Sequence, residues 1–253
     1  MRLETYSLDL EDLLLFAMLQ NVNDGFYIDI GANDPLIDSV TRFFYDRGWH
    51  GINIEPLRSK CKLLDESRPR DINLCVGIGS ESSEKIFYEI PELDILSSFS
   101  EEVARESAEE MIRTNPQVDF STREIIREIP MRIMTLTEIF KSYCDSQKPI
   151  HFCKIDVEGF EREVLIGVEN WEDFRPWIFC IEAHEPTLGR PGYTTWESIL
   201  IDHGYQFMFN FGMNRFYVDS RKNHLSKSLA QIREFLSQFE IYKIELNPLR
   251  LTS

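Results

Sequence analysis

Short apolar runs alternate with longer helix-like segments along most of this chain, and the alternation limits the folds that it can adopt. The runs are rich in β-branched and aromatic residues and cover Gly25–Ile30, Gly51–Ile54, Ile72–Ile78, Ile150–Ile155 and Trp177–Ile181. The segments between them with helical periodicity are Asp38–Arg47, Ser59–Glu66, Leu136–Tyr143, Phe160–Val168 and Thr195–His203. Strands separated by helices predict a parallel sheet with helices on both faces.

The rhythm changes near the end of the chain. Gln206–Phe211 and Arg215–Val218 are aromatic and β-branched runs, separated by a turn-forming cluster at Gly212–Asn214. Two such runs joined by a short turn are typical of an antiparallel hairpin. We therefore predict an α/β fold, with a mostly parallel seven-stranded sheet that ends in a C-terminal antiparallel hairpin.

The length and composition fit one main core with additions at both ends. The chain has 253 residues, of which 43% are hydrophobic, and a single core can grow to about this size before chains split into domains. We expect an N-terminal helical segment over 1–24, a central domain over 25–219, and a C-terminal helix and tail over 220–253.

A charged stretch over 89–128 interrupts the central domain, and its pattern predicts a helix over Ser100–Thr114. Insertions of this length are commonly lids or substrate-binding segments. A solvent-exposed surface segment without a functional role explains the composition equally well.

Charge and hydropathy exclude several classes of partner. The 27 Lys and Arg residues face 43 Asp and Glu residues, a net charge of −16, so the long-range field repels nucleic acid and anionic lipid. The apolar stretch Leu13–Leu19 follows acidic rather than basic residues, unlike a secretory signal. No apolar run approaches the roughly 20 residues that span a bilayer. We expect a cytoplasmic protein without membrane insertion, and a homodimer as the default oligomer.

The first two strands end in residues suited to binding a nucleoside. Asp29 and Gly31 lie at the end of the first strand, and ligands of open α/β sheets bind beyond the carboxyl ends of the strands. The dinucleotide fingerprint G-x-G-x-x-G is absent after Gly31, which disfavours an NAD or FAD enzyme. Glu55 ends the second strand, and its acceptor-only carboxylate suits the two hydroxyls of a ribose. The structural alternative is that the negative charge of Glu55 stabilises the N-terminus of the following helix through the helix dipole.

More acidic residues follow the fourth and fifth strands. Asp156 and Glu158 come after Ile155, whereas Glu182 and His184 come at the end of the run Trp177–Ile181. Because these strand ends share one edge of the sheet, we expect the side chains to converge on one cleft. Such a group can deprotonate a hydroxyl or bind a divalent metal. The structural alternatives are helix capping by Asp156 or Glu158 and a half-buried role for His184.

Four motifs in order carry a resemblance to a known family. They are YIDIGAN (Tyr27–Asn33), GWHGINIEP (Gly48–Pro56), KIDVEGFE (Lys154–Glu161) and IEAHEP (Ile181–Pro186). The chain resembles the FkbM-type family of S-adenosylmethionine-dependent methyltransferases, which implies a Rossmann-like class I methyltransferase fold. It is similar to the subgroup found with bacterial surface-polysaccharide and lipopolysaccharide genes, in which DIGANDP is followed by SVTRFFYDRGW.

The resemblance implies roles for individual residues. Asp29, Gly31 and Asn33 would surround the methionine part of S-adenosylmethionine, and Glu55 would hold its ribose. Asp156 would lie near the transferred methyl group.

We expect His184 or Asp156 to accept the proton of the acceptor, while Glu158 and Glu182 orient the acceptor by hydrogen bonds. A Mg²⁺ ion held by Asp156, Glu158, Glu182 and His184 is an alternative. Direct hydrogen bonding explains the same residues, so we favour it over the metal.

These observations lead to one main hypothesis on function and two alternatives. The main hypothesis is O-methylation of a sugar hydroxyl in bacterial polysaccharide or lipopolysaccharide biosynthesis, with a sugar or glycan as acceptor. One alternative is O-methylation of a small secondary metabolite, and the other is a non-catalytic methyltransferase-like scaffold. The set of Asp29, Glu55 and Asp156 favours an enzyme, because a scaffold has no need of acidic groups gathered at one cleft.

Overall fold

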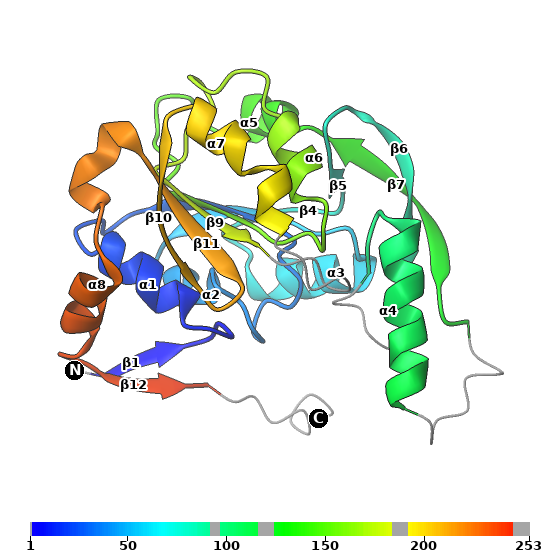
Figure 1. Ribbon diagram of the computed structural model, residues 1–253, viewed down its shortest axis with the longest axis horizontal. Coiled ribbons are helices and arrows are strands. Elements are labelled where there is room, and N and C mark those ends of the chain that lie inside the picture. The colour runs from blue at the N-terminus through cyan, green and yellow to red at the C-terminus, as the bar shows by residue number, and fades with distance from the viewer. Residues whose placement is uncertain (1, 92–96, 116–123, 184–191, 245–253) are drawn as a thin grey trace.

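A seven-stranded sheet forms the centre of the computed structural model, which describes residues 2–91, 97–115, 124–183 and 192–244 (Figure 1). The strand order is β10-β11-β9-β8-β2-β3-β4. These strands are β2 (Phe26–Ile30), β3 (His50–Ile54), β4 (Ile72–Leu74), β8 (Phe152–Ile155), β9 (Ile178–Glu182), β10 (Tyr205–Phe211) and β11 (Asn214–Asp219). The strands from β9 to β4 run parallel, and β11 and β10 form an antiparallel hairpin beside β9. The predicted sheet with its C-terminal hairpin is confirmed.

Helices cover both faces of this sheet, because successive side chains of a strand point in opposite directions. On β2, Ile28 and Ile30 pack in one core, and Tyr27 packs in a second core. The helices of the first core are α5 (Leu136–Tyr143), α6 (Glu161–Ile166) and α7 (Glu197–Asp202), and those of the second are α1 (Glu11–Met18), α2 (Arg42–Tyr45) and α8 (Leu229–Leu236). Burial on both faces explains why the central strands read as continuous apolar runs.

The helices lie where the sequence pattern predicts them, with one clear difference in length. Helix α2 is shorter than the predicted Asp38–Arg47 because Asp38 has a φ of +53°, which does not continue a right-handed helix. Helix α3 (Arg58–Ser67) connects β3 to β4. In the described part of the chain, no helix combines the length and the apolar character that crossing a bilayer requires.

The predicted strand Ile72–Ile78 is in fact two strands that belong to different sheets. Only β4 pairs with β3, whereas β5 (Gly77–Ile78) pairs with β7 (Arg127–Met134) in a three-stranded sheet completed by β6 (Ser83–Glu89). The pairing partner changes from β3 to β7 between Leu74 and Gly77, and the continuous apolar pattern does not indicate that change.

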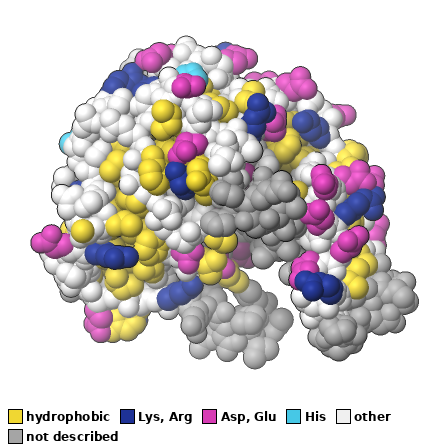
Figure 2. Space-filling model, viewed as in Figure 1, with side chains coloured by type: hydrophobic (Ala, Val, Ile, Leu, Met, Phe, Trp, Pro, Cys, Tyr) yellow, Lys and Arg dark blue, Asp and Glu magenta, His cyan; other side chains and the backbone are white. Residues whose placement is uncertain are grey.

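The charged stretch 89–128 is bounded by the antiparallel strands β6 and β7, and both project to one side of the central sheet (Figure 1). Its predicted helix is confirmed as α4 (Glu101–Thr114), which begins after Ser100, whose side chain accepts a hydrogen bond from the Val103 N–H group. Figure 2 shows acidic and basic side chains gathered on the right of the molecule, where α4 lies.

The two ends of the described chain meet in a feature that the sequence analysis did not predict. Strand β1 (Arg2–Thr5) pairs in parallel with β12 (Glu240–Lys243), and α1 contacts α8. Lys243 Nζ donates to the Leu8 carbonyl at 2.9 Å. The buried Asn214 side chain, on the edge hairpin, donates to Glu11 Oε1 at 2.8 Å. The N-terminal segment is therefore held by both the C-terminal strand and the edge hairpin.

Candidate active site

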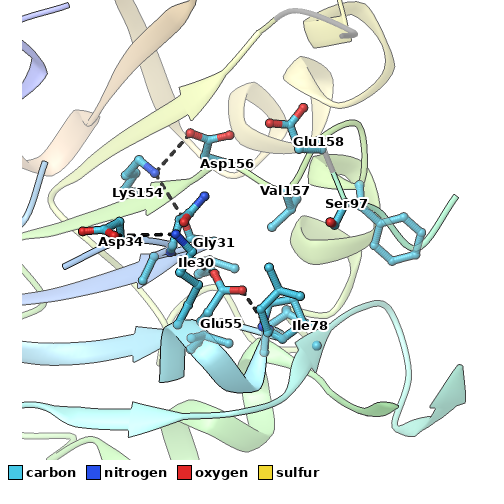
Figure 3. Close-up of a pocket in the computed structure, with 18 of the residues that line it drawn as sticks. Ile30, Gly31, Asp34, Glu55, Ile78, Ser97, Lys154, Asp156, Val157 and Glu158 are labelled. Carbon is cyan, nitrogen blue, oxygen red and sulfur yellow. Dashed lines mark hydrogen bonds and ion pairs between the residues drawn. The ribbon is translucent and has the colours of Figure 1, made fainter. Parts of the chain in front are cut away.

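A cavity of about 290 Å³ opens at the carboxyl ends of the parallel strands (Figure 3). Its walls include Gly31 and Asn33 after β2, Glu55 after β3, Gly77 on β5, and Asp156 after β8. Ligands of open α/β sheets bind in this position. The volume is close to the lower end of the range for small-molecule sites.

The turn after β2 brings backbone against backbone at the floor of the cavity. Gly31 has a φ of +76°, and a Cβ atom there would lie 1.7 Å from the Asp156 carbonyl oxygen. Asn33 has a φ of +45°, and its Oδ1 atom is buried without a hydrogen-bond partner. Gly31 is therefore required by the close approach of β8, and Asn33 offers an acceptor at the cavity wall.

Glu55 lines the cavity, and its contacts involve the start of α3, in line with the structural alternative from the sequence. Its side chain is buried and accepts hydrogen bonds from the Asn33 and Leu57 N–H groups, both at 2.8 Å. Leu57 is the residue that precedes α3. The carboxylate thus fixes the start of α3 and the turn after β2, and it also lines the cavity.

Asp29 is not among the residues that line the cavity, but it contacts Lys154, which is. It pairs with Asn53 on β3 and Lys154 on β8, so the three side chains share the face of the sheet toward α2. Thr41 Oγ1 donates to Asp29 Oδ2 at 2.7 Å, and Lys154 Nζ lies 3.7 Å from Asp29 Oδ1. Burial raises the pKa of Asp29, although Lys154 opposes this effect.

Lys154 is a site residue that the sequence analysis missed. Its Nζ lies 3.2 Å from Asp156 Oδ2, and its side chain is 9% exposed and lines the cavity. Burial alone lowers the pKa of Lys154, but the carboxylates of Asp156 and Asp29 raise it above its usual value. A lysine inside the apolar run Ile150–Ile155 was the available signal, since a buried ammonium needs a partner.

The predicted acidic group beyond β8 and β9 is assembled, apart from His184. One carboxylate oxygen from each of Asp156, Glu158 and Glu182 lies within 4.8 Å of the others. Burial raises the pKa of both Glu158 and Glu182, and the neighbouring Asp156 carboxylate raises it further. Asp156 and Glu158 line the cavity (Figure 3), whereas Glu182, the last residue of β9, is not among the lining residues. His184 lies outside the described residues.

Glu161 shapes the loop that carries Glu158, and the sequence analysis assigned it no role. It is buried, and its Oε1 accepts from the Val157 and Gly159 N–H groups, both at 3.2 Å. Burial raises the pKa of Glu161 to about 7, while these backbone groups oppose the shift. Within the loop that it holds, Glu158 has a φ of +53°.

The charged stretch 89–128 also reaches the cavity. Ser97 and Phe99 line it, and Ser98 Oγ donates to the Glu158 carbonyl at 3.3 Å. The Phe99 ring packs against Phe87 and Phe160, with centroid distances of 4.8 and 5.8 Å. This segment therefore forms part of the wall beside the acidic group.

The sequence matches a known protein family over the region that forms the cavity and the acidic group. The model of the methyltransferase FkbM domain matches residues 29–207, which include every cavity and acidic-group residue named above. No curated protein matches the chain. The match covers more than half of the chain, and the order and directions of the strands agree with a Rossmann-like class I methyltransferase fold. The chain therefore belongs to the FkbM methyltransferase family.

Proposed function

We propose that this protein transfers a methyl group from S-adenosylmethionine to a hydroxyl oxygen of a sugar, in the biosynthesis of a bacterial polysaccharide or lipopolysaccharide. One observation carries the proposal: a single cavity joins Asn33 and Glu55 at one end to Asp156 and Glu158 at the other. The first pair suits the cofactor, and the second pair suits an acceptor hydroxyl. Membership of a methyltransferase family supports this arrangement.

The residues at the first end fit the cofactor chemically. A carboxylate offers about four acceptor positions, so Glu55 can accept from ribose hydroxyls in addition to its two backbone N–H groups. The buried, unpartnered Oδ1 of Asn33 suits the ammonium group of the methionine part. When bound, S-adenosylmethionine supplies an electrophilic methyl group on a sulfonium.

The residues at the second end fit the acceptor. In its ion pair with Lys154, Asp156 is a carboxylate that can accept the proton of the acceptor hydroxyl. Glu158, with its raised pKa, binds a proton more readily and can donate a hydrogen bond to the acceptor, and Glu182 lies next to it in the acidic group. Lys154 itself is held by Asp29, so the position of Asp156 depends on the β2–β8 pairing. His184 remains the second candidate for the base.

Calorimetric titration with S-adenosylhomocysteine tests the cofactor assignment. We expect saturable binding to the wild-type protein and at least tenfold weaker binding to Asn33→Gly, which keeps the positive φ but removes the acceptor. Glu55→Gln should weaken binding similarly, and Glu66→Gln, an exposed change on α3, should not. A folded wild-type protein that binds no S-adenosylhomocysteine would overturn the assignment.

Transfer of a labelled methyl group to a panel of acceptors tests the reaction. The panel contains monosaccharides, nucleotide sugars, glycans and small phenolic metabolites. We expect label in a sugar, with kcat lowered at least a hundredfold in Asp156→Asn, the scale of general-base catalysis, and a much smaller change in affinity for S-adenosylhomocysteine. Label only in the phenolic metabolites contradicts the sugar assignment. Cofactor binding without transfer to any acceptor class supports the scaffold instead.

A further inference from the structure

Three carboxyl groups meet at the end of the cavity where the acceptor binds in the proposed function. Lys154 and Cys180 pair across β8 and β9. Asp156 follows the end of β8 and Glu182 is the last residue of β9, so the two residues lie at the same edge of the sheet. With Glu158, they bring three carboxylate oxygens within 4.8 Å of one another. Within the described ranges, no other three His, Cys, Asp or Glu side chains gather in this way.

Hydrogen bonds inside the protein, including one between the Glu182 and Asp156 side chains, account for only part of this group. Lys154 pairs with Asp156, but Glu182 Oε2 is buried without a hydrogen-bond partner among the described residues. The Glu182 residue is 7% exposed. A buried carboxyl oxygen normally has a donor or a cation beside it. An unpartnered oxygen next to two further carboxyl groups therefore indicates a missing positive ligand.

We propose that Asp156, Glu158 and Glu182 bind one divalent cation of the Mg²⁺ class at the acceptor end of the cavity. The proposal rests on the proposed function, because it assigns a partner to the acceptor side of that same site. Oxygen-only donors favour hard cations such as Mg²⁺ or Ca²⁺ over zinc. Two oxygens on opposite sides of such an ion are about 4.2 Å apart for Mg²⁺ and about 4.8 Å for Ca²⁺, and the three oxygens here lie within 4.8 Å of one another, close enough to share one ion.

The position of the three carboxyl groups gives the cation a role in the reaction. Asp156 and Glu158, two of the three ligands, line the cavity, so a cation that they hold is within reach of an acceptor bound there. A hydroxyl oxygen bound there is held in place and loses its proton more easily. The O–H bond breaks, and the proton passes to an oxygen of one of the three carboxylates that does not coordinate the ion.

Titration of the full chain with Mn²⁺ tests the site directly, by electron paramagnetic resonance and by the thermal midpoint, with and without S-adenosylhomocysteine. We expect one Mn²⁺ to bind, Mg²⁺ to displace it, and the midpoint to rise as Mn²⁺ is added. Glu182→Gln keeps the side-chain shape and should weaken Mn²⁺ binding at least tenfold. Glu169→Gln, which changes an exposed glutamate paired with Lys141, should leave it unchanged.

The outcomes separate this proposal from the proposed function. If the folded protein binds S-adenosylhomocysteine but not Mn²⁺, the cation site is wrong and the methyltransferase assignment stands. Mn²⁺ binding that is equal in wild type and in both Glu182→Gln and Asp156→Asn also overturns the site. If Mn²⁺ binds and both of these variants abolish it, the site is supported, whatever the result with S-adenosylhomocysteine.

Discussion

At the scale of single residues, a buried arginine holds one wall of the cavity without touching its contents. Arg68 is fully buried, and its guanidinium donates to the Pro35 carbonyl at 2.7 Å and to Ser39 Oγ at 3.0 Å. These two residues lie in the segment between Asn33 and Thr41, which includes cavity-lining positions. Both contacts come from Nη2, while Nη1 donates to the Tyr27 hydroxyl at 3.4 Å, and the point charge of a lysine cannot reproduce this fork.

Replacing Arg68 therefore tests how far the wall depends on it. We expect Arg68→Lys to lower the free energy of unfolding by about 2 kcal/mol, the scale of hydrogen bonds to a charged group, and to weaken S-adenosylhomocysteine binding about tenfold. Urea unfolding and calorimetry give the two values. Arg70→Lys is the matched control, because Arg70 stacks on the same Tyr45 ring but is exposed. Equal effects of both changes would contradict the argument.

A second residue makes stability depend on pH. His151 is buried beside Trp177, its Nδ1 accepts from the Phe26 N–H group, and burial lowers its pKa to about 4. The unfolded chain takes up the proton near pH 6.5, so the contribution of the neutral ring is complete above that pH and is lost as pH falls toward 4. We expect this loss to be about 2 kcal/mol, allowing for solvent screening.

Urea unfolding at several pH values isolates the effect by comparison with His151→Gln, which keeps an acceptor for Phe26. The free energies of unfolding of the two proteins should diverge between pH 6.5 and 4, and the wild type should lose more. Parallel curves would show that another group carries the pH dependence.

At the scale of elements, the sequence predicts what is local and misses what depends on distant partners. The central strands are recognisable because burial on both faces makes them continuously apolar, as in Phe152–Ile155. Strands β6 and β7 cannot be recognised from the sequence, because exposed and buried side chains alternate irregularly along them and much of each strand is charged. The change of sheet between β4 and β5 is decided by β7, more than fifty residues later.

The residues of the candidate site also fall into those that a local motif predicts and those that depend on distant contacts. Gly31, Glu55 and Asp156 are predictable because short motifs place them directly after strands. The roles of Lys154 and Arg68 depend on register and on contacts across the fold. Asp29 belongs to a recognisable motif, but its contacts with Thr41 and Lys154 depend on the fold and could not be predicted from that motif.

The β6–β7 extension supplies an element-scale prediction through Phe99. We expect Phe99→Ala to weaken S-adenosylhomocysteine binding about tenfold, because the ring closes the cavity wall against Phe87 and Phe160. Calorimetry measures the change. Ile112→Ala is the control, since Ile112 lies on α4 of the same charged stretch, is 39% exposed and does not line the cavity. If the two variants bind alike, the stretch does not contribute to the cofactor site.

At the scale of the whole molecule, the two ends of the described chain contact each other, and the N-terminal segment also lines the cavity. Leu8 lines the cavity, and the carbonyl of the same residue accepts from Lys243 on β12. We expect removal of residues 240–253 to lower the free energy of unfolding by about 2 kcal/mol through lost β1–β12 hydrogen bonds, and to weaken S-adenosylhomocysteine binding. Lys243→Ala removes one contact and should affect binding more than stability. An unchanged affinity in both would contradict the link.

The pairing of β1 with β12 also sets an order for biosynthesis. All strands of the central sheet have been synthesised once β11 has left the ribosome. Strand β1, by contrast, can pair only after residues 240–243 have been synthesised, near the other end of the described chain. Such a contact is the slowest kind to form, because it closes the longest loop. A nascent chain stalled shortly before Glu240 therefore has its central sheet and its edge hairpin, but its first strand is an unpaired edge that a chaperone or a second nascent chain can bind.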